Sequence, residues 1–167
     1  MNRTTVGGPK LGGGRGAGGV VVLADPAGAG SGAVAPLLAN SLHPSVLLRA
    51  DDFRRAIRQG FVPSHLPQAH RQNETALAAA IQAAFAFATG GYQVVLEATV
   101  APPALDVLRR ESRTTGAPLH YVVLRPSGGP GKSDPPDRHD VDVAAEPKAT
   151  AGTVLAGLGR GAFLLGW

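Results

Sequence analysis

The chain alternates between short apolar runs and longer segments with helical periodicity, and clear turn residues separate them. Short runs rich in Val and Leu predict buried β-strands, whereas longer segments with apolar residues three and four positions apart predict helices. We expect strands at Val20–Ala24, Ser45–Arg49, Tyr92–Glu97, Pro118–Arg125 and Val141–Ala144. We expect helices at Ala33–Leu42, Asp51–Ile57, Arg71–Thr89, Pro102–Thr115 and Pro147–Arg160, with Pro36 tolerated in a first turn.

This alternation predicts one α/β domain over residues 19–167. It would have three layers, with a parallel sheet of about five strands and helices on both faces. Residues 1–18 are Gly-rich and basic, and we expect them to form a flexible leader. Residues 60–70 are rich in Pro and His, and residues 127–139 in Gly, Pro and charge, so both segments are predicted to be irregular.

Composition narrows the class of protein further. Hydrophobic residues make up 44% of the 167 residues, which suits a globular chain with a real core. The absence of cysteine excludes disulfides, thiol catalysis and thiolate metal sites. No apolar run has the length of a membrane span, and the N-terminus lacks the apolar core of a signal peptide. We therefore expect a cytoplasmic protein with no membrane partner.

The charge is concentrated at one end of the chain. The net charge is +4, but Arg3, Lys10 and Arg15 lie in the first 19 residues, which contain no acidic residue. The remainder is nearly neutral, and aromatic residues are only 5% of the chain. Because basic clusters with interleaved aromatics are absent, we expect no nucleic-acid partner.

Polar residues follow several of the predicted strands. Asp25, Asp51, Asp52, Glu97 and Arg125 each lie at or directly after a strand end. In parallel sheets ligands bind at the carboxyl ends of the strands, so these residues predict a site. Asp51 equally suits a helix N-cap. Glu97 ends a buried strand, where a carboxylate must be paired or have a raised pKa.

The first strand runs into a Gly-rich turn and a helix start, the setting of a phosphate-binding loop. The pattern G-x-x-x-x-G-K-[ST] is met only at Gly30. Asp25 stands for the first Gly, Ser31 for the Lys and Gly32 for the Ser/Thr, and Gly28 lies in the same turn. The loop therefore lacks the positive charge and the metal-binding hydroxyl, and its carboxylate would repel a polyphosphate.

Five segments, in order along the chain, carry a resemblance to one family. They are the turn at residues 20–32, Asp51-Asp52-Phe53-Arg54, Ala69-His70-Arg71-Gln72-Asn73, Gly91–Glu97 and Tyr121–Ser127. They resemble the small P-loop kinases of the chloramphenicol-phosphotransferase and zeta-toxin type, which phosphorylate small-molecule hydroxyls. The resemblance covers roughly residues 20–125, resumes weakly in residues 139–165 and implies a P-loop NTPase-like fold.

The resemblance also implies roles for acceptor-side residues. In that family the Asp after the second strand is the base on the acceptor hydroxyl, a place that Asp52, or alternatively Asp51, would occupy. Glu97 stands at the Walker B position. His70 and Arg71 are expected to face the same crevice, where Arg71 could bind an anionic group.

The family's helical lid, with its Arg residues, is missing. Residues 126–140 are too short and Pro-rich for a lid helix, although Lys132 could fold back toward the phosphate pocket. Arg125, before this segment, could stack on a ligand or pair with an acid. ATP-dependent kinase activity is therefore not the expected one.

Our leading hypothesis is a repurposed kinase fold that acts on a small organic molecule by acid/base chemistry without nucleotide, metal or other cofactor. Dehydration, cyclisation, isomerisation and hydrolysis all fit. Several acids sharing one pocket push some pKa values upward, as general-acid chemistry needs. The expected catalytic residues are Asp25, Asp52, His70 and Glu97, and the expected substrate-binding residues are Asp51, Arg71, Asn73 and Arg125.

Two alternatives remain open. One is an ATP- and Mg²⁺-dependent phosphotransferase whose donor site is rebuilt with Lys132 or Arg125. The other is a non-catalytic pseudokinase that binds or regulates a partner. The chain could also form a homo-oligomer.

Overall fold

The computed structural model describes Leu11 and residues 17–127 and 139–166. The strands are β1 (Val20–Ala24), β2 (Ser45–Arg49), β3 (Gln93–Glu97), β4 (Leu119–Arg125) and β5 (Asp140–Asp142). The helices are α1 (Ser31–Ser41), α2 (Ala50–Arg55), α3 (His70–Thr89), α4 (Pro102–Thr115) and α5 (Pro147–Gly159), with a 3-10 turn at Pro67–Ala69 before α3. Within the described residues, no helix has both the length and the apolarity needed to cross a membrane.

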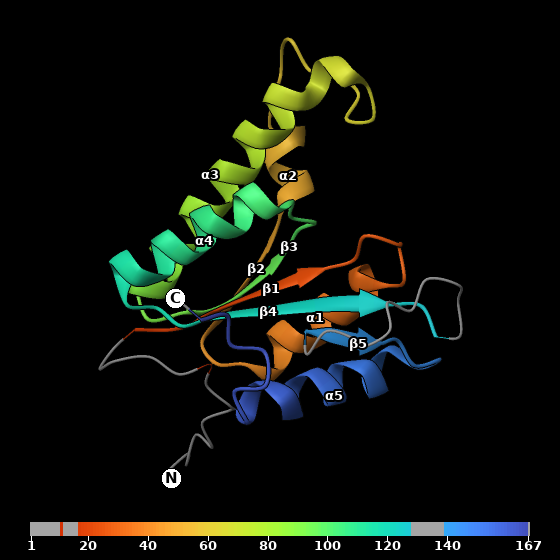
Figure 1. Ribbon diagram of the computed structural model, residues 1–167, viewed down its shortest axis with the longest axis vertical. Coiled ribbons are helices and arrows are strands. Elements are labelled where there is room, and N and C mark those ends of the chain that lie inside the picture. Colours follow the sequence, from red (N-terminus) through yellow and green to blue (C-terminus); the bar gives the residue numbers. More distant parts are fainter. Residues whose placement is uncertain (1–10, 12–16, 128–138, 167) are drawn as a thin grey trace, which may run out of the picture.

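The five strands form one parallel sheet in the order β2-β3-β1-β4-β5, as the alternating pattern predicts. Strand β1 is central, and Val20 lies opposite Val94 of β3 on one side and Leu119 of β4 on the other. All carboxyl ends therefore meet at one edge of the sheet. Figure 1 shows α3 and α4 over one face of the sheet and α1 and α5 over the other.

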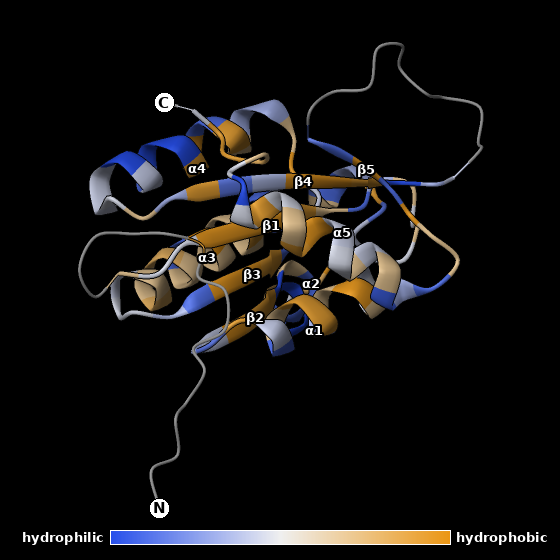
Figure 2. Ribbon diagram, turned by 90° about the horizontal axis from the view of Figure 1, so that it is seen from below, coloured by the Kyte–Doolittle hydropathy of each residue, from blue (hydrophilic) through white to orange (hydrophobic). Residues whose placement is uncertain are grey.

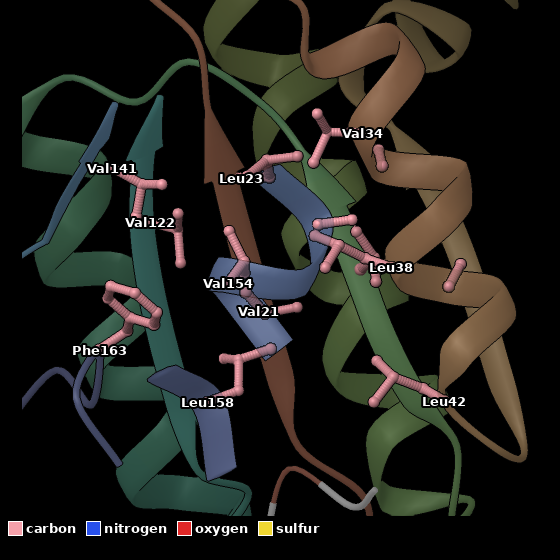
Figure 3. Packing of buried hydrophobic residues seen from close by; sticks show 14 of the residues in the cluster. Val21, Leu23, Val34, Leu38, Leu42, Val122, Val141, Val154, Leu158 and Phe163 are labelled. Carbon is pink, nitrogen blue, oxygen red and sulfur yellow. The ribbon is translucent and has the colours of Figure 1, made fainter. Parts of the chain in front are cut away.

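Each face of the sheet has its own apolar core, because alternate residues of a strand point to opposite faces. Val21 and Leu23 of β1 pack with α1 and α5, and Figure 3 shows Leu38 and Val154 converging on them. Val20 and Val22 pack with the buried residues of α3 and α4. Figure 2 shows the matching pattern, with apolar strands inside and a polar outer surface on α4.

The observed elements differ from the predicted ones mainly at their ends. Helix α1 begins at Ser31, two residues before the predicted start, so Pro36 lies in the second turn and not in the first. The carboxylate of Asp25 bonds to the backbone at this helix start, which extends the helix toward the turn. Strand β5 is shifted to Asp140–Asp142, because only these residues pair with the end of β4.

Two described residues of the predicted leader pack against the sheet. Leu11 is buried, its N–H donates to Gln93 Oε1 at 2.9 Å, and its carbonyl oxygen lies 2.9 Å from His120 Nε2. Gly18 lies so close to the backbone of Tyr92 that a Cβ would come within 1.8 Å of the carbonyl oxygen. Residues 1–10 and 12–16 lie outside the described residues, so the leader as a whole stays a prediction.

His120, which contacts Leu11, makes the stability of the fold depend on pH. Burial lowers the pKa of His120, and it outweighs the opposing effect of the bond to Leu11. The unfolded chain therefore binds more protons than the folded one between the folded pKa and about 6.5, the ordinary histidine value. We expect the free energy of unfolding to decrease as the pH falls from about 6.5 through the folded pKa of His120.

The measurement is urea unfolding of the wild type and the His120→Gln variant across neutral and mildly acidic pH. The variant should lose the part of the acid sensitivity that His120 contributes. Equal pH slopes in the two proteins would show that His120 does not contribute.

Candidate active site

A cavity of about 510 Å³ lies at the carboxyl ends of β1, β2 and β3, where the strand-end residues predict a site. It is bounded by the turn after β1, by α2, by the first half of α3 and by the start of α4. The acidic residues that line it are Asp25, Asp51, Glu74 and Glu97, and the basic ones are Arg49, Arg54 and His70. The site is therefore rich in paired charge.

Asp25 binds the Gly-rich turn through its side chain. Its Oδ1 accepts a hydrogen bond from the N–H of Ala29 at 2.5 Å, and its Oδ2 accepts from Gly30 at 2.9 Å and Ser31 at 2.8 Å. Gly28 and Gly30 have φ values of 67° and 126°, which L side chains rarely adopt, and so let the backbone turn in this way. The carboxylate thus sits at the positive N-terminus of α1.

The folded turn lowers the pKa of Asp25. Burial acts to raise it, but the hydrogen bonds from the backbone of Ser31, Ala29 and Gly30 together outweigh burial and lower it. A carboxylate held by several N–H groups prefers its ionised form. Asp25 is therefore ionised at neutral pH and is not one of the acids whose pKa the shared pocket would raise.

Glu97 bridges the turn and β2. Its Oε1 accepts a hydrogen bond from the Ser31 hydroxyl at 2.8 Å, and its Oε2 accepts from Arg49 Nε at 2.9 Å. Arg49 lies directly opposite Glu97 in the register of β2 and β3, so the sheet itself sets this ion pair. Of the two predicted states of Glu97, the paired one is present, and its partner is Arg49.

The structure separates the two aspartates after β2. Asp51 lines the cavity and pairs with Arg54, which also lines it. Asp52 does not line the cavity, and its exposed carboxylate lies 3.8 Å from Arg55. Neither caps α2, because the helix begins at Ala50. The cavity position expected of Asp52 therefore belongs to Asp51.

The helical period decides which side chains of α3 reach the cavity. His70, Asn73, Glu74 and Leu77 line it, because residues three and four apart share a helix face. His70 Nε2 lies 3.1 Å from Glu74 Oε1. Arg71 points elsewhere and is exposed, so the expectation that it faces the crevice with His70 is wrong.

Asn73 is held in one orientation. Its Nδ2 donates to the Ser64 carbonyl oxygen at 2.9 Å. Its Oδ1 is shielded from solvent and has no hydrogen-bond donor among the described residues. A buried polar atom without a partner is uncommon, so this oxygen is an unused acceptor on a residue that lines the cavity.

Arg125 lies away from this cavity. Its guanidinium donates to Asp140 Oδ2 of the neighbouring strand at 2.7 Å, and both side chains are largely buried. Of its two predicted roles, the ion pair is present. Lys132 and most of the predicted lid segment lie outside the described residues.

Sequence reasoning missed four polar residues of the lining, namely Arg49, Arg54, Glu74 and Thr99. Two signals could have found some of them. Arg49 ends a predicted strand, and Glu74 lies one helical turn after His70. In the described part of the chain, His and acidic residues form no group of three or more that could hold a metal ion.

Comparisons with known proteins identify the fold. No family model and no curated protein matches the chain. It is similar to the Mycobacterium tuberculosis APS kinase CysC in complex with AMPPNP and APS, with a TM-score of 0.64, 15% identity and coverage of 84% of this chain and 96% of that one. It is also similar to the Deinococcus radiodurans tunicamycin resistance protein, with a TM-score of 0.60, 15% identity and coverage of 84% and 95%.

A third similar structure is a putative kinase from Chloroflexus aurantiacus, with a TM-score of 0.60, 17% identity and coverage of 89% of this chain and 100% of that one. Identities this low establish a shared fold and no more. The chain has a P-loop NTPase-like kinase fold: a five-stranded parallel sheet with helices on both faces.

The role of Asp25 in the turn can be tested by stability. Asp25→Asn replaces one accepting oxygen with an amide group that faces backbone N–H donors. We expect the free energy of unfolding to fall by about 1–3 kcal/mol at neutral pH, the cost of leaving such donors unsatisfied. Because the pKa of Asp25 is lowered, its contribution is present above the ordinary Asp pKa and is lost as the pH falls through the folded value.

Urea unfolding at neutral and strongly acidic pH gives both quantities. The control is Asp106→Asn, because Asp106 is an exposed aspartate on α4 with only an i,i+3 partner, Arg109. A change at Asp25 no larger than the change at Asp106 would contradict the assigned role.

Proposed function

We propose that this protein binds a small organic molecule in the cavity at the carboxyl ends of β1, β2 and β3 and acts on it without a nucleotide. One observation carries the proposal: the carboxylate of Asp25 occupies the backbone N–H groups of Ala29, Gly30 and Ser31. In P-loop proteins, N–H groups at the start of this helix hold phosphate oxygens.

A polyphosphate would have to displace Asp25 and then lie beside it. Each hydrogen bond between a charged group and the backbone stabilises the folded chain by about 1.5–3 kcal/mol. Two like charges about 4 Å apart repel by about 4 kcal/mol at the effective dielectric of a protein surface. The carboxylate therefore both fills the anion position and opposes a second anion there.

The other residues at the positions where a P-loop binds the phosphates and Mg²⁺ of a nucleotide are also unsuited to it. Ser31 stands where the pattern has Lys, and Gly32, at the Ser/Thr position, has no hydroxyl for Mg²⁺. The Ser31 hydroxyl donates to Glu97, whose second oxygen holds Arg49. This local network leaves the loop without a free cation for phosphate charge among its described residues.

The acceptor side supplies groups for proton transfer. His70 and Glu74 lie one helical turn apart at the cavity, 3.1 Å between Nε2 and Oε1, so the carboxylate orients the imidazole. An imidazole can either donate or accept a proton, as acid/base chemistry requires. Asp51 is the second candidate base. This arrangement suits acid/base chemistry on a polar organic substrate.

A non-catalytic binding role is the second candidate. It is favoured by the ion pairs of Asp51 with Arg54 and of Glu97 with Arg49, which engage two of the four carboxylates of the cavity. A binding protein would return its ligand unchanged after incubation, whereas the leading proposal requires a product. Mass spectrometry of the recovered ligand separates the two.

Calorimetry with ATP and Mg²⁺ tests the proposal directly. We expect no binding heat from the wild type at millimolar nucleotide, because Asp25 fills the anion position. The Asp25→Gly, Ser31→Lys double variant should gain ATP binding, since it frees the N–H groups and restores a cation.

The Ser31→Lys single variant is the matched control, and we expect it to remain without binding because Asp25 is still in place. Melting curves of all three proteins show whether each is folded. Saturable ATP binding by the wild type would overturn the proposal.

A further inference from the structure

We infer that the ligand of this cavity is an organic cation, a hydroxylated amine, and not an anion. The inference rests on the proposed function and narrows its substrate class. It is carried by the charges of the lining, by their partners and by the apolar part of the wall.

Negative charge exceeds positive charge in the lining. Among the described residues it contains four carboxylates, against two guanidiniums and one imidazole. One carboxylate therefore remains in excess even when His70 is protonated. Asp25, whose pKa is lowered, holds its charge by backbone bonds and has no cationic partner among the described residues. Such a lining attracts cations and repels anions.

The two guanidiniums are already engaged. Arg49 donates to Glu97 at 2.9 Å, and Arg54 pairs with Asp51. An anionic ligand would have to share a guanidinium with the carboxylate already bound to it, which would repel the ligand. An ammonium group meets no such obstacle, because a carboxylate can accept several hydrogen bonds at once.

The apolar part of the cavity wall indicates that the ligand also has a hydrocarbon portion. Ala76 and Leu77 of α3 and Ala101, Pro103 and Ala104 at the start of α4 give the wall this apolar part. A hydrocarbon portion of the ligand would lose water against this part.

The unused acceptor Asn73 Oδ1 belongs to a residue of the same wall, and a hydroxyl or ammonium is the kind of group that it lacks.

The experiment is an NMR screen of the full chain with matched fragments. Each set holds an amino alcohol, the neutral alcohol of the same skeleton and the corresponding carboxylate. We expect the amino alcohols to shift the backbone signals of Ala76, Leu77 and Ala104 most often and at the lowest concentrations. Carboxylates that bind as often as amines, or a screen in which no amine shifts these signals, would overturn the inference.

A charge variant sharpens the test. Glu74→Gln removes one lining carboxylate, and we expect it to weaken amine binding about two- to fivefold, as for an exposed charge pair, while the neutral alcohol is unaffected. Asp106→Asn makes a similar change outside the cavity and should leave both affinities unchanged. Equal weakening of amine and alcohol in Glu74→Gln would contradict the role of charge.

The proposed function and this inference can fail independently of each other. Nucleotide binding by the wild type would remove the proposed function but leave the preference for amines measurable. A preference for carboxylates, with no nucleotide bound, would remove only this inference.

Discussion

The carboxylate of Asp25, bonded to three consecutive backbone N–H groups, is the interaction on which this end of the molecule depends. It closes the turn after β1 and satisfies donors at the start of α1, where the helix dipole favours a negative charge. The same bonds lower the pKa of Asp25 and keep it ionised at neutral pH. The Asp25 side chain thus places a negative charge at the N–H groups where a P-loop kinase binds the phosphate of its nucleotide.

The sheet order extends this arrangement into a site. Strand β3 lies between β1 and β2, so Glu97 at its end reaches Ser31 after β1 and Arg49 at the end of β2. The turn, the strand ends and the cavity floor are therefore one hydrogen-bonded unit. A substitution of Ser31 would remove the hydrogen bond that links the turn to Glu97.

The elements and the general position of the site could be predicted from local patterns. Apolar runs and turn residues place the strands to within a few residues, because burial in a parallel sheet requires them. The rule that ligands meet strand ends selects Asp25, Asp51 and Glu97, and all three line the cavity. The sequence alone also places Asp25 and Ser31 where the P-loop pattern has Gly and Lys.

Contacts between segments distant in sequence decide which side chains reach the cavity and how their charges are paired. Arg71 and Asp52 are excluded from the cavity by the rotation of their helices, and one residue of difference in a helix turns a side chain by about 100°. The pKa of Asp25 is lowered because burial competes with N–H groups whose directions follow from the folded turn. The sequence therefore determines which elements form and which residue types reach the edge of the sheet. Only the tertiary structure decides which of those charges meet, because pairing depends on angstrom-scale distances that local patterns do not contain.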